Sequence, residues 1–166
     1  LKENIKNKKL KFLDMGSGSG YQAQTIINLG VSQKNITLVD INPKALKHLK
    51  LIFPKSRVIK SNLFSNIKEK YDIIFFNSPY LPEDKREPKS SRLATTGGRY
   101  GGELLNKFLK RAKSFLKKGG KVYIVVSSLT KNINFEGYDK KIMDKKKIFF
   151  EELLVYELKD GKNTKI

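Results

Sequence analysis

Short apolar runs alternate with helical patterns along most of the chain. Runs of strand length lie at 10–15, 35–41, 57–63, 71–76 and 121–128, and two closing strands are predicted at 138–148 and 149–158. Apolar residues at helical spacing predict helices at 21–29, 43–51 and 103–116. Strands that alternate with helices predict an α/β protein with a mostly parallel sheet. Because the connection 128–138 has little room for a crossover helix, the last connection should be abbreviated or antiparallel.

The strand at 71–76 ends in a polar motif, Asn77-Ser78-Pro79-Tyr80. The side-chain oxygen of Asn77 and the backbone carbonyl of Ser78 offer two acceptors to a planar NH2 group, on which Tyr80 could stack. Pro79 stiffens the turn and keeps Ser78 out of the helical region. At the carboxyl edge of an open α/β sheet, such groups face a ligand. The alternative is an ordinary strand-ending turn, since all four residue types favour turns or strand ends.

A glycine-rich loop, Gly16-Ser17-Gly18-Ser19-Gly20, joins the first strand to the first helix. Glycines let the backbone turn sharply and approach a ligand, while the first amides of the helix face an anionic or polar group. Residues 18–23 fit the GxGxxA form of the dinucleotide fingerprint, with Asp40 about 20 residues further on. Asp14 at the strand end instead suits a cationic group, because a carboxylate repels a pyrophosphate. An amino-acid-bearing nucleoside is therefore favoured, and a simple tight turn is the alternative.

Two further strand ends carry polar side chains. The carboxylate of Asp40 can accept both hydroxyls of a ribose, or it could cap the next helix. Asn42 and Pro43 already form a suitable start for that helix, which favours the ribose. Asn62, beside the backbone amide of Leu63, could bond the exocyclic amine of an adenine, although an ordinary turn asparagine is the alternative.

The segment 81–100 is the longest predicted irregular stretch, and it leaves from the presumed active edge. A long loop inside a compact domain is usually functional or disordered, so it is predicted to be a substrate-facing lid or a segment disordered without substrate. The helix that follows presents an apolar stripe and belongs to the core. The last residues, 159–166, are expected to fray.

Composition narrows the class of protein further. A chain of 166 residues is expected to form a single domain, 1–166, and the lack of cysteine excludes disulfides, thiolate zinc sites and a cysteine nucleophile. No run has the length of a membrane span, and a cytoplasmic location is expected; no metal site is predicted. The net charge of +19 invites nucleic acid or a ribosome, although a general lysine bias is the stronger explanation. The chain begins with leucine, so upstream residues are expected to be missing.

The acidic strand end with its glycine loop, Asp40 after the second strand and Asn77-Ser78-Pro79-Tyr80 after the fourth together resemble class I S-adenosylmethionine-dependent methyltransferases. Within that group the chain looks most like the small archaeal and eukaryotic branch of the HemK-related release-factor glutamine methyltransferases. That branch carries Asn-Pro-Pro-Tyr and a following glycine-rich stretch, matched here at 97–102. The resemblance implies a doubly wound, mostly parallel seven-stranded, Rossmann-like sheet with an antiparallel last strand.

Carried over by position, the resemblance implies S-adenosyl-L-methionine as cofactor. The residues implied to bind it are Asp14, Gly16, Ser17, Gly18, Asp40, Ile41, Asn62, Leu63 and Asn77. The catalytic group implied is Asn77, Ser78, Pro79 and Tyr80, with the substrate amide held by Asn77 and the Ser78 carbonyl. Ser78 departs from the family proline, and the family's N-terminal segment is absent from the sequence.

The implied substrate is a glutamine side chain in a class 1 translation release factor. Adenine N6 presents nearly the same planar NH2, so an RNA or DNA adenine methyltransferase is the second interpretation. A third is a non-catalytic module that binds RNA or a protein. The family also suggests a small zinc-binding activator subunit that pairs with the sheet edge.

Overall fold

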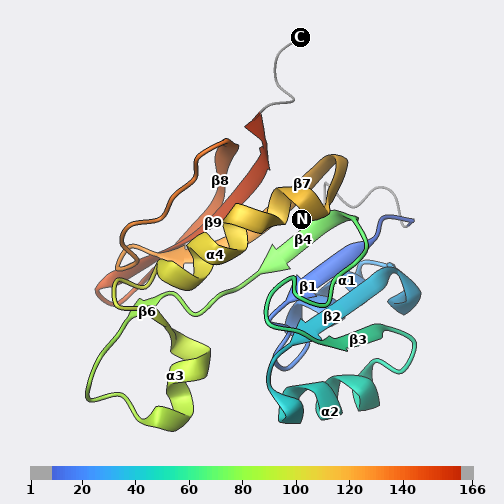
Figure 1. Ribbon diagram of the computed structural model, residues 1–166, viewed down its shortest axis with the longest axis horizontal. Coiled ribbons are helices and arrows are strands. Elements are labelled where there is room, and N and C mark those ends of the chain that lie inside the picture. Colours follow the sequence, from blue (N-terminus) through green and yellow to red (C-terminus); the bar gives the residue numbers. More distant parts are fainter. Residues whose placement is uncertain (1–8, 162–166) are drawn as a thin grey trace. The chain divides into compact units, whose positions relative to one another are not determined.

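The computed structural model describes residues 9–161 (Figure 1). Its strands are β1 (Phe12–Met15), β2 (Ile36–Asp40), β3 (Arg57–Lys60), β4 (Tyr71–Phe76), β5 (Leu81–Pro82), β6 (Thr96–Gly98), β7 (Leu116–Ser127), β8 (Tyr138–Ile148) and β9 (Glu151–Asp160). Its α-helices are α1 (Tyr21–Asn28), α2 (Pro43–Ile52), α3 (Lys89–Thr95) and α4 (Glu103–Ala112), with short 3-10 turns at Gln33–Asn35 and Lys113–Phe115. No helix in this part of the chain is long and apolar enough to cross a membrane.

The main sheet has seven strands in the order β3-β2-β1-β4-β7-β9-β8. β1, β2 and β3 pair in parallel, whereas β9 is antiparallel to both β7 and β8. The predicted mostly parallel seven-stranded sheet with an antiparallel last strand is therefore confirmed. The chain divides into two compact units, the first up to Phe75 with 115–120 and the second comprising 76–114 and the residues from Lys121 on.

The first unit holds β1, β2 and β3 side by side, with α2 next to β3 (Figure 1). All four residues of β1 are buried, as expected for a strand covered on both faces. The predicted start of α2 is confirmed, because the side chain of Asn42 accepts a hydrogen bond from the Lys44 amide at 2.9 Å and Pro43 is the first helical residue.

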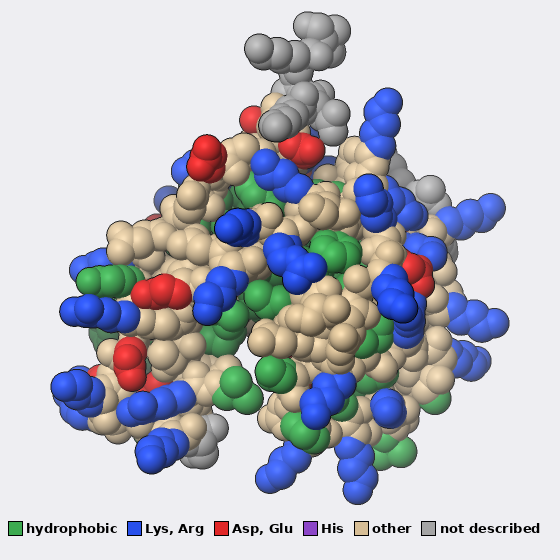
Figure 2. Space-filling view, viewed as in Figure 1, with side chains coloured by type: hydrophobic (Ala, Val, Ile, Leu, Met, Phe, Trp, Pro, Cys, Tyr) green, Lys and Arg blue, Asp and Glu red, His purple; other side chains and the backbone are tan. Residues whose placement is uncertain are grey.

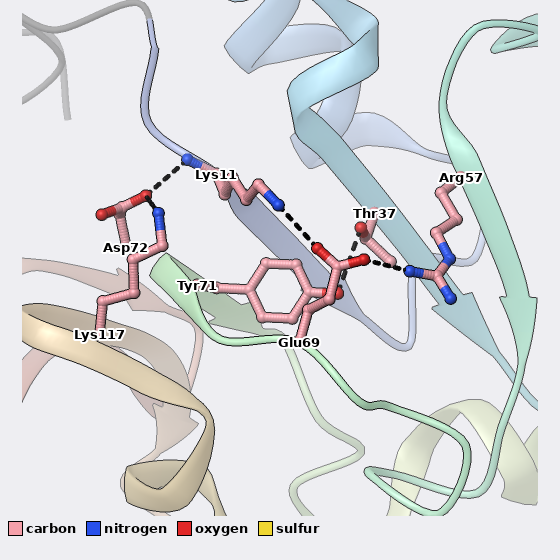
Figure 3. A network of polar contacts seen from close by, with 7 residues as sticks. All are labelled: Lys11, Thr37, Arg57, Glu69, Tyr71, Asp72 and Lys117. Carbon is pink, nitrogen blue, oxygen red and sulfur yellow. Dashed lines mark hydrogen bonds and ion pairs between the residues drawn. The ribbon is translucent and has the colours of Figure 1, made fainter.

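A polar network joins the residues at the starts of these strands (Figure 3). Glu69 binds Lys11 at 2.7 Å and also pairs with Arg57. Asp72 accepts from the Lys11 amide and from the Lys117 side chain, both at 2.7 Å. The Lys11 and Glu69 side chains are 49% and 40% exposed, so their ion pair stabilises only weakly. The network lies at the amino ends of these strands, whereas the glycine loop follows the carboxyl end of β1.

The second unit is built around the β8–β9 hairpin and α4 (Figure 1). The ring of Phe108 in α4 packs on Phe76 with centroids 4.5 Å apart. The Tyr138 hydroxyl donates to the Leu109 carbonyl at 2.7 Å, which ties the hairpin to the helix. The pairing of β8 with β9 shifts register between Ile142 and Asp144, which marks a β-bulge.

Several predicted boundaries were wrong. The stretch 81–100 contains β5, α3 and β6, and β5 pairs in parallel with β6, so it is folded and not one long loop. The helix at 103–116 ends at Ala112, and Leu116 already belongs to β7. The strand at 57–63 ends at Lys60. Phe149 and Phe150 form a turn outside the strands. Of the tail expected to fray, Lys159 and Asp160 belong to β9, and 162–166 lie outside the described residues.

Candidate functional site: a glycine loop and an amide motif

The glycine loop after β1 has the backbone conformation that its sequence predicts. Gly16, Gly18 and Gly20 have φ angles of 65°, 53° and 81°, values that other residues rarely adopt. A side chain at Gly20 would collide with the ring of Phe53, so this glycine permits packing against α2. A Cβ at Gly18 would meet only the Gly16 carbonyl, at 3.9 Å. The open space at Gly18 leaves room for a ligand to approach the backbone.

Asp14 is the most perturbed group of this loop. Its side chain is 2% exposed, and its Oδ2 atom has no hydrogen-bond partner within the described residues. Burial, and secondarily the charge of Asp40, raise the pKa of Asp14 from 3.8 to about 7. A buried carboxylate without a partner is costly, so this atom is suited to a cationic ligand group.

Ser17 is used inside the loop itself. Its hydroxyl donates to the Asp14 carbonyl at 2.7 Å and accepts from the Val39 amide at 2.9 Å, while its own amide donates to the Val39 carbonyl at 2.9 Å. These bonds join the loop to the end of β2. The hydroxyl of Ser17 therefore shapes the cofactor loop.

Asp40 also joins the loop to its neighbour. One carboxylate oxygen accepts from the Gly18 amide and the other from the Asn42 amide, each at 2.8 Å. Asp40 thus orders the turn before α2, and because its oxygens keep free lone pairs, the ribose contact stays a prediction. Beside it Ile41 is 44% exposed, an apolar side chain at the same strand end.

The turn after β3 carries the remaining predicted cofactor contacts. The Asn62 side chain is exposed, and its backbone carbonyl accepts from the Ser65 hydroxyl at 2.7 Å. Leu63 has a φ of 50°, unusual for a branched residue, and its carbonyl accepts from the Ser61 hydroxyl at 2.7 Å. An outlier of this kind is typical of a functional turn.

In the second unit, Asn77 follows buried β4 and is exposed. Ser78 is 2% exposed, and its hydroxyl has no hydrogen-bond partner in residues 9–161. Pro79 and Tyr80 are half-buried, and burial, with a smaller effect of Glu151, raises the pKa of Tyr80. The motif thus presents the Asn77 amide to solvent, while the following residue, Ser78, is buried.

The glycines at 97–102 pack directly against this turn. A Cβ at Gly97 would lie 2.5 Å from the Pro79 carbonyl, and one at Gly101 would collide with the Tyr80 carbonyl. Only glycine allows the two backbones to approach this closely. The Tyr80 carbonyl also accepts from the Thr130 hydroxyl at 2.8 Å. The sequence analysis missed Thr130, whose only signal is its place just after β7.

Comparison with known proteins agrees with these features. A family model described as methyltransferase small domain matches residues 1–138. A Methanocaldococcus jannaschii protein, provisionally named a protein N5-glutamine methyltransferase, is 37% identical over 92% of this chain and 81% of its own length. A ribosomal RNA small subunit methyltransferase C from Psychromonas ingrahamii is 30% identical over 76% of this chain, which spans only 32% of that protein.

The similar solved structures share the fold. In the complex of Mtq2 and Trm112 from E. cuniculi, described as responsible for methylation of the termination factor eRF1, the matched chain has a TM-score of 0.71 and 20% identity. The match covers 95% of this chain and 89% of that one. The family match spans most of the sequence, and the orphaned Asp14 oxygen and the open loop suit S-adenosylmethionine as cofactor. The chain therefore belongs to the methyltransferase small domain family and is an S-adenosylmethionine-dependent methyltransferase.

Proposed function

We propose that this chain methylates the side-chain amide nitrogen of a glutamine in a class 1 translation release factor. The observation that carries the proposal is the exposed amide of Asn77 at the end of a buried strand. Close backbone packing of Gly97 and Gly101 and a hydrogen bond from Thr130 hold the turn that follows it. The name of the Methanocaldococcus jannaschii relative and the description of the Mtq2–Trm112 complex support a glutamine of a termination factor as the acceptor.

The first unit offers groups for each part of the cofactor. Asp14 would hold the ammonium group, beside the backbone of Gly16 and Gly18. Asp40 would accept from the ribose hydroxyls, since each of its oxygens makes one described hydrogen bond and a carboxylate oxygen can accept two. The adenine contacts proposed are Ile41, Asn62 and Leu63. S-adenosylmethionine supplies an electrophilic methyl group on a sulfonium sulfur.

The second unit would hold the acceptor. The lone pair of an amide nitrogen is delocalised, so the nitrogen reacts poorly unless it is oriented and desolvated. The Asn77 side-chain oxygen and the Ser78 carbonyl would accept its two N–H groups and orient the nitrogen for methyl transfer, with Tyr80 packing on the amide plane. Such orientation can lower a barrier by about 7–11 kcal/mol in favourable cases. Transfer would form the nitrogen–methyl bond and break the sulfur–methyl bond, and the nitrogen oriented by Asn77 and Ser78 would release one proton to water.

Labelled S-adenosylmethionine tests this assignment. The protein is incubated with a purified class 1 release factor, or with single-stranded RNA and DNA, and the labelled peptide is identified by mass spectrometry. Label on one glutamine, lost in Asn77→Ala, is the expected result. Label confined to nucleic acid would refute the proposed acceptor.

Adenine N6 of RNA or DNA is the second candidate acceptor. The net charge of +19 favours this acceptor, because it would attract nucleic acid or a ribosome. However, Figure 2 shows Lys and Arg side chains spread over the face in view and not gathered into one patch, which suits a general charge bias better than a dedicated groove. The single-stranded arm of the labelling experiment tests this candidate directly.

A small zinc-binding activator subunit is the proposed partner, because the family resemblance suggests one and one of the similar solved structures is a complex with Trm112. We expect the partner to pair with the sheet edge, as the family resemblance implies. Higher solubility and activity on co-expression would support the pairing, whereas full activity of the chain alone would argue against it. A single methyltransferase domain and a cytoplasmic location stay predictions.

A further inference from the structure

The turn between β8 and β9 exposes two adjacent aromatic rings. Ile148 pairs with Glu151, so Phe149 and Phe150 form a two-residue hairpin turn. Their exposed fractions are 90% and 87%, the highest of the large hydrophobic residues described. Neither ring therefore contributes to the core.

This turn also departs from the residues that its backbone favours. Phe149 has a φ of 51° whereas the φ of Phe150 is not positive, and a two-residue hairpin turn with positive φ at its first position favours glycine there. A bulky side chain is rare in that region of backbone conformation. The turn thus combines a strained backbone with exposed apolar surface, and each of these properties is typical of a binding site.

Hydrogen bonds connect this turn to the amide motif within the second unit. The residue after the turn, Glu151, accepts from the Ser127 hydroxyl at 2.5 Å. The Ser127 amide donates to the Thr130 hydroxyl at 3.2 Å, and that hydroxyl donates to the Tyr80 carbonyl at 2.8 Å. The charge of Glu151 also contributes to the raised pKa of Tyr80. The turn therefore lies on the same side of this unit as the motif.

The charges beside the turn favour a polypeptide over a nucleic acid. Glu151 and Glu152 follow the rings directly, whereas Lys145, Lys146 and Lys147 precede them, with Lys147 opposite Glu152 in the hairpin. A polypeptide can carry both signs of charge to match this mixed surface, whereas the two carboxylates would repel the uniformly negative backbone of a nucleic acid. Base stacking on the rings would also need an unopposed positive groove.

We propose that Phe149 and Phe150 dock on the polypeptide segment that flanks the glutamine held by Asn77 and Ser78. This inference rests on the proposed function and adds to it a surface that recognises protein sequence. The rings would anchor the flanking segment through apolar contact, so they would set the affinity for the protein substrate without taking part in methyl transfer.

The decisive variant is Phe149→Gly combined with Phe150→Asn, because glycine suits the positive φ at the first turn position better than phenylalanine does. We expect the KM for the release factor to rise at least tenfold and its directly measured binding to weaken equally. The kcat, the affinity for S-adenosylmethionine and the thermal midpoint should be unchanged, or the midpoint should rise. Leu51→Gln, at an 81% exposed position on α2, is the matched control and should leave every value unchanged.

Several outcomes would overturn the inference. Unchanged KM and binding in a folded double variant would exclude docking at this turn while leaving the proposed function intact. A lower midpoint together with lost cofactor binding would assign the turn a structural role. Weakened single-stranded RNA binding, with release-factor binding unchanged, would make nucleic acid the occupant. If the parent chain binds the release factor but does not methylate it, only the proposed function is refuted. If it neither binds nor methylates the release factor, the proposed function and the docking inference are both refuted.

Discussion

The glycine loop after β1 and the amide motif after β4 each contain a buried serine, and the two serines are used differently. The Ser17 hydroxyl bonds to the backbone at both Asp14 and Val39, whereas the Ser78 hydroxyl has no hydrogen-bond partner in residues 9–161. In the first region, bonds within the loop fix its shape, and the buried Oδ2 atom of Asp14, which has no hydrogen-bond partner within the described residues, is suited to an ammonium group. In the second region the turn is held by neighbouring backbone, and its polar groups are left for a substrate.

The comparison predicts the largest effect at Asn77. Asn77→Ala removes one of the two proposed acceptors for the substrate amide, so kcat should fall about 10²- to 10³-fold, as for loss of one oriented hydrogen bond in an active site. Calorimetry should show the affinity for S-adenosylmethionine nearly unchanged. An equal loss of cofactor affinity would place Asn77 mainly in the cofactor region.

Asp14 should control cofactor affinity through its charge. Asp14→Asn should weaken binding of S-adenosylmethionine roughly 10- to 100-fold, as expected when a charged hydrogen bond is lost. Because burial and Asp40 raise the pKa of Asp14 to about 7, affinity in the parent protein should increase between about pH 6 and pH 8. The ligand-free protein should lose stability as pH rises towards about 7, since the folded state disfavours the ionised form.

Calorimetric titration and thermal unfolding at a series of pH values check both trends. The Asp14→Asn variant is the control and should lose most of each pH dependence. A cofactor affinity that stays constant with pH in the parent protein would contradict the role given to this carboxyl group.

Gly97 should matter for the second region alone. A Cβ there lies 2.5 Å from the Pro79 carbonyl, so Gly97→Ala should destabilise the protein by about 1–3 kcal/mol and lower kcat. Gly119→Ala is the control, because a Cβ at Gly119 meets no atom within 4 Å, although its φ of 74° carries some strain. Urea unfolding and turnover of both variants would show whether the contact or the glycine itself matters.

Replacing each of the two buried serines, Ser17 and Ser78, by alanine should give the smallest of the expected changes, and these changes differ in sign. Ser17→Ala should cost about 1–3 kcal/mol of stability, because it leaves the buried Val39 amide without the side-chain acceptor. Ser78→Ala should be neutral or stabilise by about 1 kcal/mol, since it removes a buried hydroxyl that has no partner. Equal losses in thermal unfolding would show that the comparison is wrong.

Local sequence predicted the first region better than the second. The positive φ angles of the three loop glycines and the cap formed by Asn42 depend on residues close in sequence, so spacing and capping rules predicted them, while the role of Asp14 stays a prediction. The apolar stripe ending at Leu116 predicted helix, but the chain enters β7 there and Gly120 packs against the Tyr71 carbonyl in β4. Phe149 and Phe150 have high strand propensity, yet the pairing of β8 with β9 places them in a turn. Such outcomes depend on distant partners that no local window contains.

The contact between Gly97, Gly101 and the Pro79–Tyr80 turn involves main-chain atoms on both sides. Pairing of Leu81 with Thr96 and of Pro82 with Gly98 holds both ends of the intervening segment. Within the intervening residues 83–95, the Glu87 carboxylate also accepts from the Thr96 hydroxyl of β6 at 2.7 Å. Changes of length or sequence in this segment that keep the Glu87–Thr96 contact should therefore leave the Pro79–Tyr80 turn in place, so substrate contacts can vary there without moving the amide motif.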